Sequence, residues 1–300
     1  MTTVKTGSSS IVLGSINYRD YIPYKNNKLL KITKITDKHN EFKLLDEIKK
    51  INYFRYYYTI PEDNPQVLEN DSIFYSHIQK FAEDMSLFNY PLHYFYIDYA
   101  GDTDLLDTIE NLINRKDFTI WKNYNTIIKF SKHILEGLHF LHQRKICHLD
   151  IKPENIMVNS NQYKIIDFGF ASMEPFTDYL EYFKGTPGYF PSKIKGDIPT
   201  NWLPKIDTDD MIPVNNIMPY RKDIKLVYKV DSYCFGRVLF YLKYIYKENK
   251  TYGCFSSEKK NESKLNAIID ALLEKSVVKR VTAKECLNLF FNTKLTYNII

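Results

Sequence analysis

Two short stretches decide the fold of this chain: HLDIKPEN at residues 148–155 and IDFGFA at residues 166–171. The first stretch places an aspartate, a lysine and an asparagine at fixed offsets, as Asp150, Lys152 and Asn155. The second adds Asp167, which follows Asp150 by 17 residues (167 − 150). Two carboxylates, an amide oxygen and an ammonium in this order can hold a triphosphate, its magnesium ions and an acceptor hydroxyl in one geometry.

Each of these residues also has an ordinary interpretation. Asp150 alone would be a surface aspartate that caps a turn, and Asp167 alone would sit in a turn between two strands. The joint spacing with Lys152 and Asn155 favours the functional interpretation. Ile165 and Ile166 before Asp167, and Phe168-Gly169 after it, strengthen that interpretation.

The two stretches resemble the catalytic loop and the metal-binding motif of eukaryotic-type protein kinases, and Lys152 is typical of the serine/threonine branch. The resemblance covers nearly the whole chain, from about residue 4 to about residue 291. It implies that Asp150 is the catalytic base and that Lys152 neutralises charge on the transferring phosphate. It also implies that Asn155 and Asp167 are the Mg²⁺ ligands and that ATP is the phosphate donor.

Composition sets wide bounds on the fold and on the partners. The 300 residues are 44% hydrophobic and 15% aromatic, which is enough apolar material for a sizeable core in one large domain or two ordinary ones. A formal charge of +5 is modest and gives no reason to expect a nucleic-acid partner. The four cysteines form no CxxC pair, and we see neither an apolar leader nor a membrane-length apolar run. We therefore expect reduced thiols, no membrane partner and a cytoplasmic location.

The order of predicted elements indicates an α+β protein with two lobes. Strands are expected in the first third, and helical periodicity follows Gly101. We therefore predict a single kinase domain over residues 1–300. It has a small β-rich N-lobe with the hinge at 1–101, a larger helical C-lobe at 102–300, and an irregular insertion at about 192–228. The predicted strands are a pair within 4–13, then 29–35, 72–80 and 93–99; the predicted helices are 40–51, 103–112, 124–143 and one that starts near residue 229.

The nucleotide-binding residues are expected in the first lobe. The family's glycine-rich phosphate loop falls on the segment at 5–12, where only one of its three glycines is present; the expected contacts are Thr6, Gly7, Ser8, Ser9, Ser10 and Val12. Lys31 resembles the strand lysine that bridges the α- and β-phosphates. A partly buried ammonium needs a carboxylate, and Glu41 is the first choice for it, with Glu47 as the alternative.

The hinge between the lobes is expected at residues 96–101. There Asp98 and Ala100 would offer backbone groups to the adenine, and Ile97 would close the back of the pocket. The ordinary alternative is a strand end followed by a turn glycine, but the DLLDTI sequence that follows resembles the family at this point.

Three later segments resemble the family's substrate side. GTPGYF, at residues 185–190, resembles the loop that receives the acceptor residue, and we expect Thr186 to hydrogen-bond toward Asp150 and Lys152. VDSYCFG, at residues 230–236, resembles the buried helix whose aspartate, here Asp231, steadies the catalytic loop. KRVTAKECL, at residues 279–287, resembles the closing helix of the lower lobe.

Three departures from the family pattern carry consequences. Leu149 stands where the family usually has an arginine that pairs with a phosphorylated activation loop, and leucine cannot make such bonds. The family's APE triplet is absent, so Arg280, which matches the usual partner of its glutamate, must find another partner. Finally, little of the chain precedes the phosphate loop, which weakens the expectation of tight nucleotide binding.

The sequence therefore predicts a serine/threonine protein kinase that works without activation-loop phosphorylation on a protein substrate, in an oligomeric state left open. A pseudokinase that binds nucleotides or partners is the alternative, supported by the glycine-poor loop. A small-molecule kinase of the aminoglycoside type shares the H-x-D-x-x-x-x-N loop, but the GTPGY segment and the Asp231 segment argue against it. Compact kinases of large DNA viruses resemble this chain in two respects: a brief upper lobe and an amino-acid composition of the kind that an AT-rich genome produces.

Overall fold

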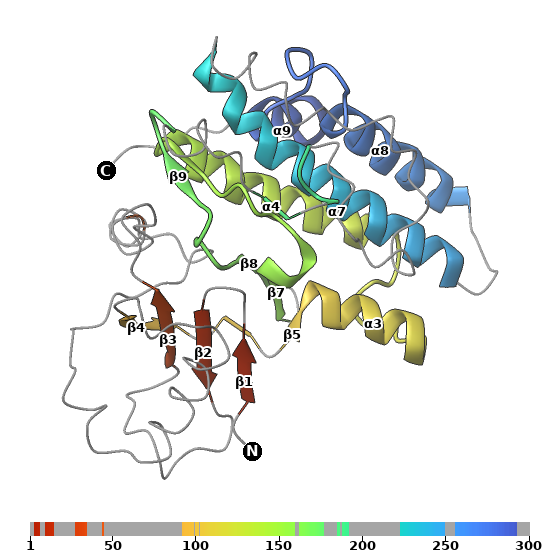
Figure 1. Ribbon diagram of the computed structural model, residues 1–300. Helices are drawn as coiled ribbons and strands as arrows, with labels where there is room; N and C mark the ends of the chain where they lie inside the picture. Colours follow the sequence, from red (N-terminus) through yellow and green to blue (C-terminus); the bar gives the residue numbers. More distant parts are fainter. Residues whose placement is uncertain are drawn as a thin grey trace. The chain divides into compact units, whose positions relative to one another are not determined.

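The computed structural model covers residues 1–300, and the chain divides into two compact units, Met1–Ala100 and Gly101–Ile300, which we describe separately. The description covers residues 3–6, 10–14, 28–34, 44, 92–98, 100–101, 103–159, 162–176, 185–186, 188–191, 223–249 and 256–292. The first unit contains a sheet, and the second is mostly helical (Figure 1).

Four antiparallel strands form the sheet of the first unit, in the order β1-β2-β3-β4. Their bounds are β1 Thr3–Thr6, β2 Ser10–Gly14, β3 Lys28–Lys34 and β4 Leu92–Asp98. These bounds confirm the strand pair within 4–13 and the strands at 29–35 and 93–99. The predicted strand at 72–80 lies outside the described residues. So does most of the predicted helix at 40–51, of which Leu44 is helical and buried.

The strand register aligns several residues that the sequence assigned to the nucleotide site. Val12 is opposite Lys31 in the β2–β3 pair, and Lys31 is opposite Phe95 in the β3–β4 pair. Ile97 is opposite Leu29, two residues from Lys31. Because directly paired residues and residues two apart share a face of a sheet, Val12, Lys31 and Ile97 belong to one face.

The second unit begins with a short strand and a capped helix. β5 (Thr103–Asp104) leads directly into α3 (Leu105–Arg115), so the predicted helix at 103–112 was wrong at its start. Asp104 ends the strand because its carboxylate accepts the N–H of Asp107 at 2.8 Å, and the Asp107 carboxylate in turn accepts the N–H of Asp104 at 3.4 Å. This capping box satisfies backbone donors that the first helical turn leaves unpaired.

Helix α4 (Tyr124–Gln143) has the bounds that its apolar periodicity predicts. Asn123 caps its start by accepting the N–H of Thr126 at 2.9 Å. One stripe of the helix is buried, and it includes Ile127, Phe130, Ile134, Leu138 and Leu141. α4 packs against three later helices, namely α7 (Tyr228–Asn249), α8 (Ser256–Leu272) and α9 (Ala283–Phe291).

Short strands carry the segment between α4 and α7. β6 (Ile146–Cys147) pairs with β9 (Ser172–Met173), and the hairpin of β7 (Ile156–Asn159) and β8 (Gln162–Ile165) joins β5 in a three-stranded sheet. A single 3-10 turn, η3 (Pro153–Asn155), precedes β7. Because β7 and β8 pair with each other, the end of the HLDIKPEN stretch lies close to the start of the IDFGFA stretch.

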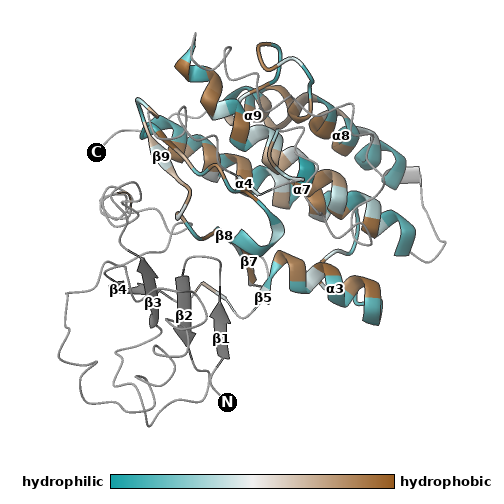
Figure 2. Ribbon diagram, viewed as in Figure 1, coloured by the Kyte–Doolittle hydropathy of each residue, from teal (hydrophilic) through white to brown (hydrophobic). Residues whose placement is uncertain are grey.

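Helix α7 has a deeply buried first half. Every residue from Val230 to Leu239 is buried, so its interior is covered on all sides. Figure 2 shows hydrophobic residues recurring along α4, α7, α8 and α9, which pack against one another. The predicted start near Lys229 is confirmed. The predicted irregular insertion at about 192–228 stays a prediction, because residues 192–222 lie outside the described residues; near its end, η5 (Ile224–Val227) is a short 3-10 helix.

An aromatic cluster fills the core beside α4. The Phe130 ring lies 4.9 Å from Tyr163, 5.4 Å from Trp121 and 5.7 Å from Phe235, all in edge-on arrangements. Such pairs add to the stabilisation that burial alone provides. The cluster therefore joins α4, β8 and α7 into one core.

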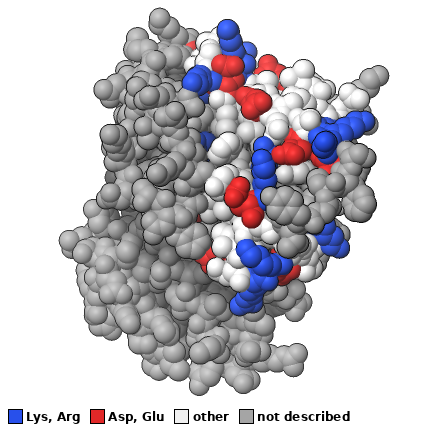
Figure 3. Space-filling view, turned by 90° about the vertical axis from the view of Figure 1, so that its right-hand side faces the viewer, with Lys and Arg blue, Asp and Glu red and all other residues white. Residues whose placement is uncertain are grey.

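The surface of the second unit carries charges of both signs. In Figure 3, basic and acidic side chains alternate across the visible face. Of the helices that the structure describes, none combines the length and the apolar character that a membrane crossing needs.

Candidate active site

Asp150 is a buried carboxylate surrounded by donors. Its side chain is almost fully buried, and Oδ1 accepts both the backbone N–H of Thr186 at 3.1 Å and the Thr186 hydroxyl at 2.5 Å. Oδ2 accepts from Nδ2 of Asn155 at 3.0 Å and lies 3.3 Å from the Lys152 ammonium. A buried carboxylate without such bonds would be costly, so these contacts account for its burial.

Thr186 and Lys152 close one side of this cluster. The Lys152 ammonium donates to the Thr186 hydroxyl at 3.0 Å, so Asp150, Lys152 and Thr186 form a closed triangle of polar contacts. Thr186 lies 34 residues after Lys152 and 36 residues after Asp150 in the chain. The sequence led us to expect this contact, and its part in catalysis stays a prediction.

Asn155 and Asp167 flank one hairpin: Asn155 directly precedes β7, and Asp167 follows β8 by two residues. Nδ2 of Asn155 donates to the Asp150 carbonyl at 2.8 Å as well as to its carboxylate, which leaves the amide oxygen without a partner in the described part of the chain. The Asn155 carbonyl accepts the N–H of Ile166, the residue before Asp167, at 2.9 Å. Asp167 has a left-handed backbone with φ of 61°, and its Oδ1 accepts the N–H of Gly169 at 3.4 Å.

The backbone of the loop that carries Asp150 is held by Asp231 from helix α7. The Asp231 carboxylate is fully buried and accepts the N–H of His148 at 2.9 Å and that of Leu149 at 2.7 Å. Nε2 of His142 lies 2.9 Å from the same carboxylate. Asp231 therefore connects α4, α7 and the loop that carries Asp150; the sequence suggested its contact with the loop but not the one with α4.

Two side chains of the loop itself turn inward. His148 is fully buried; its Nε2 lies 2.9 Å from the Ile166 carbonyl, and its Nδ1 accepts the N–H of Asp150 at 3.3 Å. Leu149 is also buried, with a left-handed φ of 66°. That conformation costs a non-glycine residue about 1–2 kcal/mol, and the bond from its N–H to Asp231 offsets this cost.

The expected nucleotide-binding residues of the first unit are described only in part. Thr6, Ser10, Val12, Lys31, Ile97 and Asp98 lie in strands β1 to β4, and Ala100 is buried after β4. The expected residues Gly7, Ser8, Ser9 and Glu41, and the alternative Glu47, lie outside the described residues. The convergence of Lys31 with the residues of the second unit therefore stays a prediction.

Comparison with known protein families gives a decisive match. The model of the family described as "Protein kinase domain" matches residues 6–291. The chain belongs to the protein kinase family. The family implies a two-lobed fold and a transferase that binds ATP, and the mostly helical second unit agrees with its lower lobe.

Three curated relatives illustrate the distances within the family. The "Striated muscle preferentially expressed protein kinase" of Danio rerio is 42% identical over 100 residues, 31% of this kinase and 3% of the relative. The "Dual specificity protein kinase TTK" of Mus musculus is 29% identical over 141 residues, 45% and 16% of the two chains. The "Serine/threonine-protein kinase 17A" of Oryctolagus cuniculus is 28% identical over 172 residues, 55% and 40%.

The matched segments thus span 40% or less of these relatives' own lengths. The three relatives come from vertebrates, so they lend no support to the parallel with viral kinases.

Arg280 of this kinase has found partners other than a carboxylate. Its side chain is fully buried; Nε donates to the Glu274 carbonyl at 3.0 Å and Nη1 to the Lys229 carbonyl at 3.4 Å. The guanidinium carbon lies 4.6 Å from the centre of the Tyr233 ring, a cation–π distance. Within the described residues, Nη2 has no hydrogen-bond partner.

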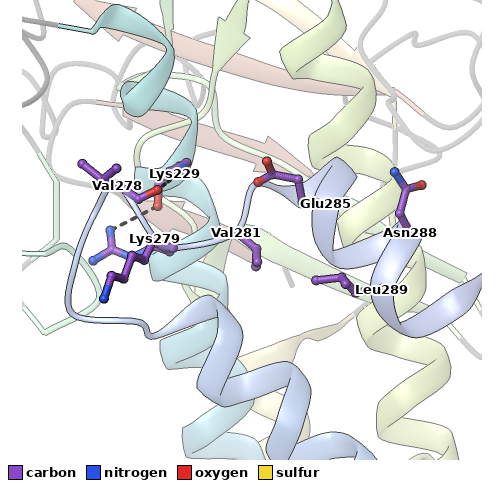
Figure 4. Close-up of a pocket in the computed structure, with 8 residues that line it drawn as sticks. Lys229, Val278, Lys279, Val281, Glu285, Asn288 and Leu289 are labelled. Atoms are coloured by element: carbon purple, nitrogen blue, oxygen red, sulfur yellow. Dashed lines mark hydrogen bonds between the residues drawn. The ribbon is translucent and has the colours of Figure 1, made fainter.

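A pocket of about 380 Å³ lies beside Arg280, between the start of α7, the loop before α9 and α9 itself (Figure 4). The loop carries the exposed Val278. The backbone carbonyl of Val278 accepts a hydrogen bond from the Lys229 ammonium at 2.7 Å. Partial burial lowers the pKa of Lys229. No predicted catalytic or nucleotide-binding residue lines this pocket, so it is separate from the candidate active site.

The sequence did not single out two groups of the site. His142 is on the buried face of α4, and a histidine there needs a polar partner, but that partner is 89 residues away. Glu154, beside Asp150 and Lys152, was also not singled out. Burial raises the pKa of Glu154, and the nearby Asp150 adds to that rise while Lys152 opposes it.

Proposed function

We propose that this chain is a single kinase domain that transfers the γ-phosphate of ATP to a serine or threonine hydroxyl of a protein. The arrangement around Asp150 supports the proposal most directly. Asp150 is buried, and both of its oxygens face donors that fix its orientation. A fixed carboxylate of this kind can accept a hydrogen bond from an acceptor hydroxyl and aim it for in-line attack.

Lys152 and Thr186 would then serve the acceptor side of the site. Lys152 lies 3.3 Å from Asp150 and would also neutralise negative charge that builds up on the transferring phosphoryl group. Thr186 holds Oδ1 of Asp150, so Oδ2 is the oxygen nearer to Lys152 and the incoming hydroxyl. One of the named relatives is a dual specificity kinase, so the choice of serine and threonine over tyrosine rests on Lys152 and Thr186.

Asn155 and Asp167 are the proposed ligands of Mg²⁺. The donor set fits the ion, because the amide oxygen of Asn155 and the carboxylate of Asp167 are hard oxygens. Asn155 already uses its amide nitrogen toward Asp150, which turns its oxygen to the opposite side. A Mg²⁺ ion held by these two residues would neutralise negative charge on the phosphates.

The nucleotide itself is proposed to bind through the first unit. Lys31 would contact the α- and β-phosphates, with Glu41 as its carboxylate partner. Val12 and Ile97, which share the sheet face of Lys31, would contact the base. The remaining proposed contacts are Thr6, Gly7, Ser8, Ser9 and Ser10 to the phosphates and Asp98 and Ala100 to the adenine.

We also propose that turnover needs no phosphate on the activation loop. Leu149 is 1% exposed and apolar, so it offers a phosphate neither charge nor access. Replacing Ser172, Thr177, Tyr179 and Tyr182 together by residues without hydroxyl groups should leave turnover within about twofold of wild type. A loss of tenfold or more would contradict this part of the proposal.

One assay separates a kinase from a pseudokinase. The chain is incubated with labelled ATP, Mg²⁺ and a generic basic protein, beside an Asp150→Asn control of the same preparation. Transfer by the wild type and its loss in the control support catalysis, and phosphoamino-acid analysis then tests the serine/threonine specificity. Nucleotide binding without transfer in either protein would favour the pseudokinase.

A further inference from the structure

Glu174 ties the segment that follows the IDFGFA motif to the start of α7. Its Oε1 accepts the hydroxyl of Tyr228 at 3.0 Å, and its Oε2 lies 3.5 Å from the ammonium of Lys145. The backbone adds a third tie, because the N–H of Glu174 donates to the Lys145 carbonyl at 2.8 Å. Lys145 is largely exposed, so its ion pair contributes little, and the bond to Tyr228 is the stronger side-chain contact.

Tyr228 is well placed to be an anchor. The fully buried Phe176 packs edge-on against its ring at 5.4 Å, so the residue two positions after Glu174 is held by the same side chain. Burial, and next the hydrogen bond to Glu174, raise the pKa of Tyr228. The hydroxyl therefore keeps its proton, and it remains a donor throughout the physiological range.

The Glu174–Tyr228 contact, here called the anchor, connects through His142 to Asp231, which holds the loop that carries Asp150. The Tyr228 ring lies 4.9 Å from the ring of His142, and His142 contacts the Asp231 carboxylate. Asp231 in turn holds the N–H groups of His148 and Leu149, directly before Asp150. A path of direct contacts thus leads from Glu174 to the catalytic loop.

We propose that Glu174 and Tyr228 are positioning residues that fix residues 172–176 against the support of the catalytic loop. This inference rests on the proposed protein kinase activity. It supplies a physical reason why no phosphate is needed. The segment carries its own carboxylate, Glu174, which contacts the phenol of Tyr228 and the ammonium of Lys145. These contacts would take the place of a phosphate paired with an arginine at position 149. A carboxylate–phenol bond is charge-assisted, so it can hold the segment without modification.

The test is a double-mutant cycle on the full chain. Tyr228→Phe removes only the hydroxyl, Glu174→Met removes the acceptor at similar length, and Glu174→Gln keeps an acceptor oxygen. Each of the first two variants should lower kcat for a protein substrate roughly tenfold, and their combination should be no worse than the more severe single variant. Glu174→Gln should recover part of the loss, and the Kd for ATP should stay within about twofold of wild type in all of them.

Hydrogen exchange supplies a readout that does not depend on catalysis. The amide protons of Glu174 and Phe176 should exchange roughly tenfold faster in Tyr228→Phe and in Glu174→Met. Matched controls are Tyr244→Phe and Glu248→Met, which change exposed residues of α7. Both controls should match the wild type.

The outcomes separate this inference from the proposed function. If the wild type transfers no phosphate but exchange accelerates as expected, the kinase proposal fails and the anchor stands. If exchange and kcat are unchanged in Tyr228→Phe, or if the losses of the two single variants multiply in the double variant, the anchor is overturned even in an active kinase.

Discussion

The hydroxyl of Thr186 and Oδ1 of Asp150 lie 2.5 Å apart, and the Thr186 N–H points at the same oxygen from 3.1 Å. One residue therefore occupies a carboxylate oxygen with two donors. That double contact fixes the rotation of the Asp150 side chain and keeps one of its two oxygens out of reach of any other donor.

Removing the Thr186 hydroxyl should therefore loosen the Asp150 carboxylate, the proposed catalytic base. Thr186→Val is expected to lower kcat by roughly 10- to 100-fold, because misplacing a reacting group is costly. Thr186→Ser keeps the hydroxyl and should stay within about threefold of wild type. Steady-state kinetics with a protein substrate provide the measurement. Equal rates for the valine and serine variants would show that the contact has no part in turnover.

The Asp231 carboxylate should be critical for stability. Asp231→Ala leaves two buried N–H groups and His142 without their acceptor, which should lower the free energy of unfolding by about 3–5 kcal/mol. Denaturant unfolding followed by circular dichroism measures this. Asp223→Ala is the matched control, since that exposed aspartate caps only η5 and should cost about 1 kcal/mol. Similar losses in both variants would contradict the expectation.

Arg280 should not tolerate lysine. A guanidinium reaches the Glu274 and Lys229 carbonyls while it lies over the Tyr233 ring, whereas an ammonium is a single point of charge. We expect Arg280→Lys to lower the free energy of unfolding by about 2–3 kcal/mol. Lys279→Met, at the exposed neighbouring position, should change it by no more than about 0.5 kcal/mol. A wild-type melting temperature for Arg280→Lys would show that the guanidinium geometry is unimportant.

The stability of the helical unit should fall in mild acid because of His139. This histidine is 4% exposed, and burial, with smaller contributions from His142 and Lys284, lowers its pKa from 6.5 to about 4. Above pH 6.5 the side chain is neutral in both the folded and the unfolded chain. Between pH 6.5 and about 4 the unfolded chain takes up the proton first, so the folded state loses up to about 2 kcal/mol.

His139→Leu removes this proton uptake and should flatten the decline over the same interval. Unfolding curves of both proteins at several pH values measure the difference. If the two proteins lose stability in parallel between pH 6.5 and 4, another group is responsible.

Local sequence signals predicted the parts of the fold that depend on neighbours in the chain. The apolar spacing of 124–143 predicted α4 residue for residue, because Asn123 and the buried stripe mark its start and its face. The start at 103 was wrong because Asp104 was counted as helical. Asp104 is a capping residue at the end of β5. The other residue of that strand, Thr103, pairs with Val158, 55 residues later in the chain.

Contacts between distant segments were predictable only where a family motif carried them. Thr186 was expected beside Asp150, and Asp231 beside the loop, on that ground. The Tyr233 face beneath Arg280 and the Glu174–Tyr228 bond leave no trace in periodicity or composition. Their partners are selected by how α7 packs, which depends on the whole core and not on any short window of residues.

The hold of Asp231 on the backbone of His148 and Leu149 also has a consequence for biosynthesis. His148 and Asp231 are separated by 83 positions, so the loop leaves the ribosome well before the residue that holds it. At translation rates of about 5–20 residues per second, the delay is on the order of ten seconds. Throughout that interval the backbone N–H groups of His148 and Leu149 lack the carboxylate that holds them in the folded chain.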